Sequence, residues 1–386
     1  MMMKNILSFL ILLILSNAVL VAQETNRNYP DFSWDKVPLA FHFGKKSGLL
    51  TPREARFIAK HSNIICLEKA HAIGQFENTE DVIEKETQQF KKLNPDMKVI
   101  FYWNAFLDYP MYYAHHEYEK HPEWWLKTKD GKLDLKQGQY KRYDLSNPEV
   151  RKWWVDVASK AVIEGSTDGV FMDAFPQISD PKNKKLWGDE KYEAIQRGLK
   201  TMIKQTRDKI GPDKLIFYNG IRSKPERNLK ADYLGDYLDY VDAIMLEHFG
   251  HSQSASKECM LRDIQELERA GKMGKIVIFK GWPCYPSSYK EFMDFEEKEK
   301  RKLAKERITF PLAAFLVGAQ ENAFFIYNWG YRMQYGCLDW YSEFDRPLGK
   351  PLGDAKYNGW EITREFEHQT VRINLETREA EIIQKK

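Results

Sequence analysis

Cysteine is scarce in this sequence. The 386 residues contain only four, which are widely scattered: Cys66, Cys259, Cys284 and Cys337. Zinc and iron–sulfur sites use closely spaced pairs of ligands, so this spacing argues against a metal cluster. The sequence leaves open whether these residues form one or two disulfides or remain free buried thiols.

An excess of charge of one sign is also lacking. Lys and Arg total 59 against 56 Asp and Glu, a formal net charge of +3. Nucleic-acid-binding proteins concentrate basic residues on one face, so we expect no nucleic-acid partner. The charged fraction of 30% and the hydrophobic fraction of 43% are typical of a soluble globular protein.

The long apolar run at the N-terminus is too short for a membrane span, which needs about 20 residues. Lys4 precedes this run at residues 6–15, and Leu-Val-Ala at 20–22 resembles a signal-peptidase site. We therefore predict a secretory signal peptide over residues 1–22 and a secreted or periplasmic mature protein without a membrane span. No cysteine follows the run, which argues against a lipid anchor.

Motifs of two other hydrolase classes are missing. The sequence has no Gly-x-Ser-x-Gly elbow, and the spacing of His42, His71, His248 and His251 matches no zinc motif. A carbohydrate esterase or deacetylase is therefore disfavoured, and we predict no metal and no cofactor. These histidines are expected to be structural or to bind sugar hydroxyls.

Short apolar runs alternate with amphipathic helical segments along most of the chain. We predict eight strands, at 37–43, 63–68, 99–104, 168–173, 215–220, 242–247, 276–280 and 323–328. Strands separated mostly by helices indicate an α/β fold, a (β/α)8 TIM barrel over residues 23–330. Residues 331–386 read differently, with three short alternating strands at 361–366, 370–374 and 379–383, and predict a small C-terminal antiparallel β appendage packed on the barrel. The oligomeric state is not predicted.

Most of the predicted strands end in a polar residue. The set comprises His42, Glu68, Asn104, Asp173, Asn219, Glu247, Lys280 and Asn328. The carboxyl ends of barrel strands form the active rim, so these side chains predict a functional site. Asp168 and Asp242, at the starts of two strands, are expected at the opposite, stabilising face.

Asp173 and Glu247 are the predicted catalytic pair. Each follows a buried strand of large apolar residues, and glycoside hydrolysis needs two carboxylic groups flanking the scissile bond. The alternatives are a loop-anchoring role for Asp173 and a buried ion pair of Glu247 with Lys280 or Arg222. Glu68 is a third acid, expected to accept a substrate hydroxyl.

Aromatic residues make up 14% of the chain, which suits either a large aromatic core or a cleft that stacks on sugar rings. Trp103, Trp282 and Trp329 lie near the ends of three strands and predict a stacking platform, with core packing as the alternative. The loop 105–145 contains Asp108 and many aromatic residues, and we interpret it as a wall of the cleft.

A resemblance adds to this reading. The run Asp-Leu-Ser-Asn-Pro-Glu-Val-Arg at 144–151, the strand Asp-Gly-Val-Phe-Met-Asp at 168–173 and the closing segments at 348–353, 364–367 and 371–374 resemble the α-galactosidase/dextranase-like barrel superfamily. More narrowly, the chain is similar to hypothetical glycosyl hydrolase family 15. The resemblance implies that Asp173 is the nucleophile and Glu247 the acid/base. Many relatives carry Asp where this chain has Glu247, so retaining and inverting outcomes both stay open.

The sequence thus predicts a secreted glycoside hydrolase that cleaves an oligo- or polysaccharide with two carboxylates. We favour retention, which requires carboxyl groups about 5–5.5 Å apart, over inversion, which requires about 6.5–9.5 Å. The alternative is a non-catalytic barrel that captures glycans at the cell surface, although such a protein would need no matched pair of acids.

Overall fold

The computed structural model describes residues 28–220, 237–252, 254–284 and 289–385. The predicted signal peptide and Arg222 lie outside these residues. No helix in the described part of the chain is long and apolar enough to cross a membrane.

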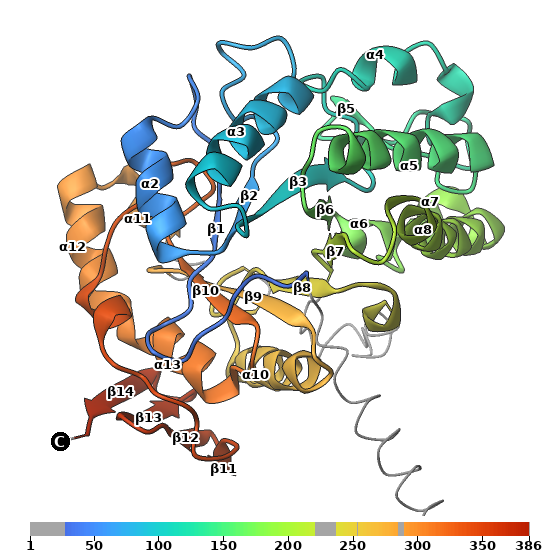
Figure 1. The fold of residues 1–386 in the computed structure, drawn as a ribbon. Coiled ribbons are helices and arrows are strands. Elements are labelled where there is room, and N and C mark those ends of the chain that lie inside the picture. The colour runs from blue at the N-terminus through green and yellow to red at the C-terminus, as the bar shows by residue number, and fades with distance from the viewer. Residues whose placement is uncertain (1–27, 221–236, 253, 285–288, 386) are drawn as a thin grey trace, which may run out of the picture.

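Eight parallel strands form the central sheet (Figure 1). They are β1 (Phe41–Phe43), β2 (Ile64–Leu67), β3 (Lys98–Asn104), β6 (Gly169–Asp173), β7 (Leu215–Tyr218), β8 (Ala243–Leu246), β9 (Ile276–Gly281) and β10 (Ala323–Tyr327). The strands pair in chain order. The ends of the sheet meet where the Ala40 amide donates to Phe325 O at 3.0 Å and the Phe325 amide donates to Pro38 O at 2.8 Å. The predicted (β/α)8 barrel is confirmed.

Helices separate the strands and cover the outside of the barrel. The longer ones are α2 (Pro52–His61), α3 (Thr79–Leu93), α5 (Pro148–Ile163), α8 (Asp189–Ile210), α10 (Lys257–Lys272), α12 (Glu297–Arg307) and α13 (Thr309–Gly318). Local signals fix several of their starts. Thr51 and Glu54 form a capping box before α2, and the Asn147 side chain accepts from the Glu149 amide at the start of α5.

Shorter elements lie between these helices and strands and after β10. They are the helices α4 (His115–Tyr118), α6 (Phe175–Ile178), α7 (Asn183–Trp187) and α11 (Tyr289–Asp294), the 3-10 turns η1 (Pro122–Trp124), η3 (Leu238–Tyr240) and η5 (Ser342–Asp345), and the hairpin of β4 (Leu135–Lys136) and β5 (Tyr140–Lys141). The long segment after β3, expected as a loop, contains α4, η1 and this hairpin.

The C-terminal segment forms a four-stranded antiparallel sheet of β11 (Lys356–Asn358), β12 (Glu361–Glu365), β13 (Gln369–Asn374) and β14 (Glu379–Gln384). The appendage is confirmed, with one strand more than predicted, because the polar and exposed β11 has no apolar alternation. This sheet packs against α13. Buried Arg364 donates to the carbonyls of Leu316 and Val317 at 3.2 and 3.3 Å, satisfying acceptors at the carboxyl end of that helix.

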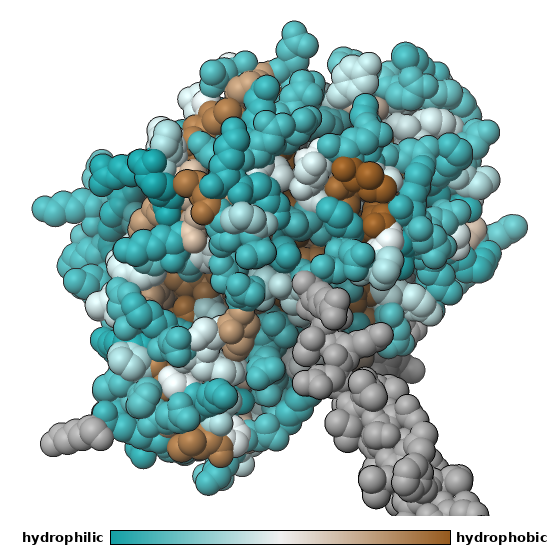
Figure 2. Space-filling view, viewed as in Figure 1, coloured by the Kyte–Doolittle hydropathy of each residue, from teal (hydrophilic) through white to brown (hydrophobic). Residues whose placement is uncertain are grey.

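The core is apolar and continuous, and hydrophilic residues cover most of the face seen in Figure 2, with hydrophobic residues in small separate patches. All four cysteines are free and buried. Of the two outcomes that the sequence left open, the structure shows free thiols.

Candidate active site

Asp173 and Glu247 lie together at the carboxyl ends of β6 and β8. The side-chain nitrogen of Asn219, which follows β7 between them, donates to Asp173 Oδ1 at 3.1 Å and to Glu247 Oε2 at 2.8 Å. Because one nitrogen bonds both, the two carboxylate oxygens lie within about 6 Å of each other, the most that two hydrogen-bond lengths allow. Asn219 therefore acts as a spacer that fixes the separation of the two acids.

Asp173 is held by donors from three strands. Besides Asn219, its carboxylate accepts from the Tyr102 hydroxyl, from the Asn104 amide at 3.3 Å and from the backbone amide of Ala174 at 2.7 Å. Asn104 is the register partner of Asp173 in the sheet, and Tyr102 lies two residues earlier on the same face of β3. Donors of this kind orient a carboxylate and favour its ionised form.

Ala174 follows Asp173 in the left-handed region, with φ of 78°. A non-glycine residue in this conformation costs on the order of 1 kcal/mol and is typical of functional sites. The turn brings the Ala174 amide back onto the carboxylate and starts the short helix α6 directly afterwards.

Burial raises the pKa of Asp173, and the nearby Glu247 carboxylate raises it further; the Lys69 ammonium and the Tyr102 hydroxyl oppose this. Two carboxylates so close cannot both ionise easily, so the pair holds one proton over a range of pH. Such a pair can supply an acid and an anion at the same time, as bond cleavage at an acetal carbon requires.

Glu247 is fixed at both its side chain and its backbone. The Tyr331 hydroxyl, from the segment after β10, donates to Glu247 Oε1 at 2.7 Å, and His248 Nε2 lies 3.1 Å from Oε2. The Trp282 indole, from the end of β9, donates to the backbone oxygen of Glu247 at 2.8 Å. The alternative partner Lys280 does not form an ion pair with Glu247: its ammonium binds Asn328.

Glu68 lies beside this pair in a charged group of its own. Its oxygens are 3.0 Å from His42 Nε2 and 2.8 Å from Lys69 Nζ. Burial alone would raise the pKa of Glu68, but the Lys69 charge and the contacts with His42 lower it to about 2. Glu68 is thus an anion near neutral pH, and its expected role as an acceptor of a substrate hydroxyl stays a prediction.

Most of the other predicted polar contacts are buried. The side chains of His42, Asn104, Asn219, Lys280 and Asn328 belong to residues with no more than 4% of their surface exposed. They hold the reactive groups and the rim loops in place; for example, Asn104 Oδ1 accepts from the Phe106 and Leu107 amides. Their direct contact with substrate stays a prediction.

Two of the three predicted tryptophans do not face the site. Trp103 is 1% exposed and points to the outside of the barrel, where its indole donates to Trp154 O at 3.3 Å. Its neighbours Tyr102 and Asn104 take the inner face because side chains alternate along a strand. Trp329 is fully buried and packs against Phe292 of α11. The prediction that Trp103 and Trp329 stack on sugars is therefore wrong.

Trp282 remains at the rim and is partly exposed. The His251 ring stacks on it with centroids 4.3 Å apart, the Lys280 ammonium lies 4.0 Å from its ring centroid, and Tyr289 and Tyr331 meet it edge-on. Much of its ring is therefore already in contact with protein groups, and its contact with substrate stays a prediction.

Asp108 lies in the interior of the long loop instead of the cleft. Its carboxylate is 2.7 Å from His115 Nδ1, and burial raises its pKa to about 6 despite the neighbouring His115. The next residue, Tyr109, faces the rim, 5.2 Å from Lys69. The contact of Asp108 with substrate stays a prediction.

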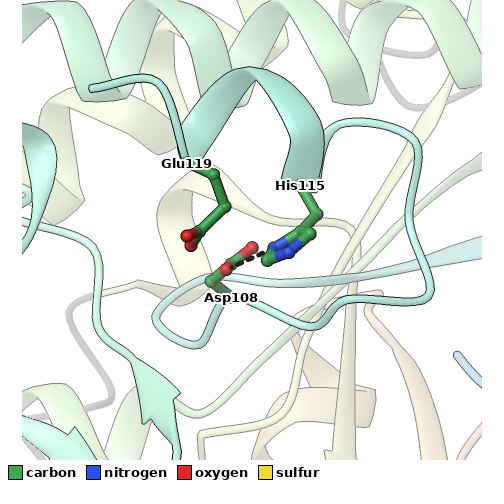
Figure 3. A group of neighbouring side chains, drawn as sticks. All are labelled: Asp108, His115 and Glu119. Atoms are coloured by element: carbon green, nitrogen blue, oxygen red, sulfur yellow. Dashed lines mark hydrogen bonds and ion pairs between the residues drawn. The ribbon is translucent and has the colours of Figure 1, made fainter. Parts of the chain in front are cut away.

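Asp108, His115 and Glu119 form the cluster drawn in Figure 3, with ligand atoms within 4.8 Å of one another. This donor set is of a kind that can hold a divalent cation. However, the Lys141 ammonium binds Glu119 and already supplies a positive charge. We interpret the cluster as an ion-pair network that fixes the loop, and the predicted absence of a metal stays a prediction.

The functional residues that the sequence analysis missed are Tyr102, Tyr331 and Lys69. Tyr102 could be found from strand alternation, because it shares a face with Asn104. Tyr331 and Lys69 lie in segments after strand ends, where no periodic signal sets the direction of a side chain.

Several solved structures have a fold similar to that of this chain. The fold is similar to an α-amylase from Geobacillus thermoleovorans solved with acarbose (TM-score 0.51, 12% identity, covering 89% of this chain and 87% of that one). It is also similar to the cyclic α-maltosyl-(1→6)-maltose hydrolase of Arthrobacter globiformis (TM-score 0.50, 11% identity, 90% and 92% covered) and to Amy13B of Eubacterium rectale (TM-score 0.50, 11% identity, 92% and 89% covered). At this identity the likeness shows the fold alone.

No curated protein sequence matches the chain. The sequence model of hypothetical glycosyl hydrolase family 15 matches residues 91–370, which include both Asp173 and Glu247. With the paired carboxylates at the carboxyl ends of the barrel strands, this match shows that the chain belongs to hypothetical glycosyl hydrolase family 15 and is a glycoside hydrolase.

Proposed function

We propose that this protein is a secreted, retaining glycoside hydrolase that cleaves an oligo- or polysaccharide, with Asp173 as nucleophile and Glu247 as acid/base. The observation that carries the proposal is that one nitrogen of Asn219 bonds an oxygen of each acid, Asp173 Oδ1 and Glu247 Oε2. The resulting upper limit of about 6 Å between these oxygens admits the roughly 5–5.5 Å of retaining enzymes and lies below the roughly 6.5–9.5 Å of inverting enzymes.

In the first step, Asp173 attacks the anomeric carbon while Glu247 gives its proton to the departing glycosidic oxygen. Burial and Glu247 raise the pKa of Asp173, but its donors, which include Tyr102 and Ala174, favour the carboxylate. We therefore place the shared proton on Glu247 at the working pH. In the second step, Glu247, now ionised, takes a proton from water, which attacks the same carbon and releases Asp173.

The polymeric substrate is supported by the rim. Tyr109 and Tyr140 of the long loop meet edge to face with ring centroids 5.2 Å apart, and the partly exposed Trp282 lies across from them in the barrel order. Aromatic side chains offer sugars large apolar contact at little conformational cost. Secretion rests on the signal-like segment at residues 1–22.

The test is release of reducing ends from a broad panel of polysaccharides by the wild type and by Asp173→Asn. We expect release by the wild type and a loss of more than about a thousandfold in the variant, roughly 4 kcal/mol of transition-state stabilisation. Full activity of Asp173→Asn would refute the assigned nucleophile, and glycan binding without release from any substrate would favour a capture protein.

The stereochemical part is tested separately. Proton NMR of the sugar first released should show the anomer of the substrate, before mutarotation. Release of the opposite anomer would show inversion and contradict the role of Asp173 as nucleophile.

A further inference from the structure

Each carboxylate of the catalytic pair accepts a hydrogen bond from a tyrosine, and a lysine lies beside each tyrosine. The Lys69 ammonium is 3.4 Å from the Tyr102 hydroxyl and 4.5 Å from the ring centroid. The Lys280 ammonium is 5.1 Å from the ring centroid of Tyr331, whose hydroxyl bonds Glu247. Two lysine–tyrosine–carboxylate chains therefore converge on the site.

The two lysines differ in what neutralises them. Lys69 is partly exposed and forms an ion pair with Glu68 at 2.8 Å. Lys280 is fully buried, and among the described residues its ammonium has no carboxylate within ion-pair distance; it binds the backbone and side-chain oxygens of Asn328. Burying an ammonium without an anion is costly, so Lys280 is unlike an ordinary core residue.

Lys280 touches both aromatic residues that hold Glu247. Its ammonium lies 4.0 Å from the ring centroid of Trp282, whose indole donates to the backbone oxygen of Glu247, and 5.1 Å from that of Tyr331, whose hydroxyl donates to the side chain. A cation near an aromatic face is attracted to the ring and draws electron density from it, which strengthens the ring's polar N–H or O–H as a donor.

We propose that Lys280 is a positioning residue for the acid/base of the reaction, acting on Glu247 through Tyr331 and Trp282. The inference rests on the proposed function of Glu247 as proton donor. Lys280 keeps the carboxyl group aimed at the leaving oxygen and limits how tightly it retains its proton, so that the proton is released in the first step and the anion is available in the second.

Among the described residues, charged and titratable groups near Glu247 come from four other parts of the barrel and from its own segment. They are Asp173 on β6, Lys280 on β9, Tyr331 after β10, Glu68 after β2, and His248 and His251 beside it. Burial, with help from His248 and Lys280, lowers the pKa of His251 to about 4, so His251 is neutral near pH 7. Burial lowers the pKa of Lys280 to about 8, which leaves it a cation at neutral pH.

Removing the positive charge of Lys280 should raise the pKa of Glu247. A cation near Glu247 favours the carboxylate and lowers its pKa, so removing the cation raises that pKa. In a bell-shaped profile, the alkaline limb reports loss of the proton from the catalytic acid. Lys280→Met should therefore move the alkaline limb to higher pH by about half a unit or more, and Tyr331→Phe should move it in the same direction.

The first experiment compares pH profiles of kcat/KM for the wild type, Lys280→Met, Tyr331→Phe and Lys275→Met on the substrate found in the panel. Lys275 is a matched control: it immediately precedes the same strand, at the end opposite to Lys280, where its ammonium donates to Val241 O at 2.9 Å. We expect a shifted alkaline limb in the first two variants and an unchanged profile in Lys275→Met. An unmoved limb in both Lys280→Met and Tyr331→Phe overturns the proposal.

The second experiment does not depend on hydrolysis. Protein with 13C-labelled glutamate carboxyl groups is titrated by NMR, and the Glu247 signal is assigned by its loss in Glu247→Gln. A higher apparent pKa of Glu247 in Lys280→Met and Tyr331→Phe supports the inference even if no substrate is cleaved, in which case only the proposed function fails. An unchanged Glu247 titration in folded Tyr331→Phe and Lys280→Met overturns it.

Discussion

Strand β6 and strand β8 each have a carboxylate at both ends, and the contacts of these acids differ between the two ends of the barrel. At the amino-terminal end, Asp168 binds the Lys91 ammonium and the Val99 amide, each at 2.8 Å. Asp242 repeats this arrangement with Arg207 and with the Ile216 amide at 2.7 Å. Each acid has a cation of its own and bonds a neighbouring strand.

At the carboxyl-terminal end, the contacts of Asp173 and Glu247 within the described residues include tyrosine hydroxyls and the Asn219 amide, and the Glu247 carboxylate lies close enough to raise the pKa of Asp173. The same residue types on the same strands therefore serve two purposes. The acids at the amino-terminal end pair with cations and stabilise the barrel, whereas under the proposed function the two acids at the rim share a proton for catalysis.

The largest expected effect separates Glu247 from Asp242. Glu247→Gln should lower kcat/KM on natural glycosides by about 10²–10⁴, because the leaving oxygen loses its proton donor. The loss should be much smaller on aryl glycosides with acidic leaving groups, which need no protonation. The measurement is kcat/KM on both substrate types, with Asp242→Asn as the matched control; equal losses on both types would remove Glu247 from the role of acid.

The next largest effect is on stability, and we expect it at the amino-terminal end of the barrel instead of at the rim. Asp168→Asn and Asp242→Asn should each lower the free energy of unfolding by about 1–3 kcal/mol, because a half-buried cation and a backbone amide lose their anionic partner. Urea denaturation at pH 7 measures this, and kcat/KM should stay within about twofold of the wild type. A large loss of activity in either folded variant would place these acids in the site.

The smallest expected effect is a gain in the stability of Asp173→Asn. Burial and Glu247 raise the pKa of Asp173, so the folded state binds its proton more tightly than the unfolded state. The stability associated with that proton is complete below the unfolded pKa and is lost as pH rises through the folded pKa. Asp173→Asn, which cannot ionise, should therefore be more stable than the wild type at pH 7 by roughly 0.5–2 kcal/mol, with the difference shrinking towards pH 4.

This last prediction is checked by denaturation of both proteins at pH 4, 5.5 and 7. A wild type that is more stable than Asp173→Asn at pH 7 and loses this advantage as the pH falls would contradict the prediction. It would mean that the hydrogen bonds to Asp173 outweigh the cost of its burial.

Much of this architecture could be predicted from the sequence, because its signals are local. Apolar runs of four to six residues predicted the eight strands, and the Thr51 capping box and the Asn147 cap predicted helix starts. The recurrence of acids at the ends of β6 and β8 predicted which two carboxylates meet at the rim. Position at a strand end sufficed to bring Asp173 and Glu247 to the same rim.

The surroundings of the pair could not be predicted in the same way. Trp103 and Asn104 are adjacent in the sequence but point to opposite faces of β3, and nearness to a strand end does not distinguish them. Tyr331 reaches Glu247 from 84 residues away, and the turn that brings it there has no periodic signal. Which donor meets which acid depends on how the barrel closes.

The most direct test of the account is to measure both activity and unfolding free energy in Asp173→Asn and Asp168→Asn, which alter the two ends of one strand. The account predicts that Asp173→Asn loses hydrolysis by more than about a thousandfold without losing stability, and that Asp168→Asn loses stability without losing hydrolysis. If both variants lost activity in proportion to their stability, the two ends of β6 would not differ in role, and the assignment of Asp173 would be contradicted.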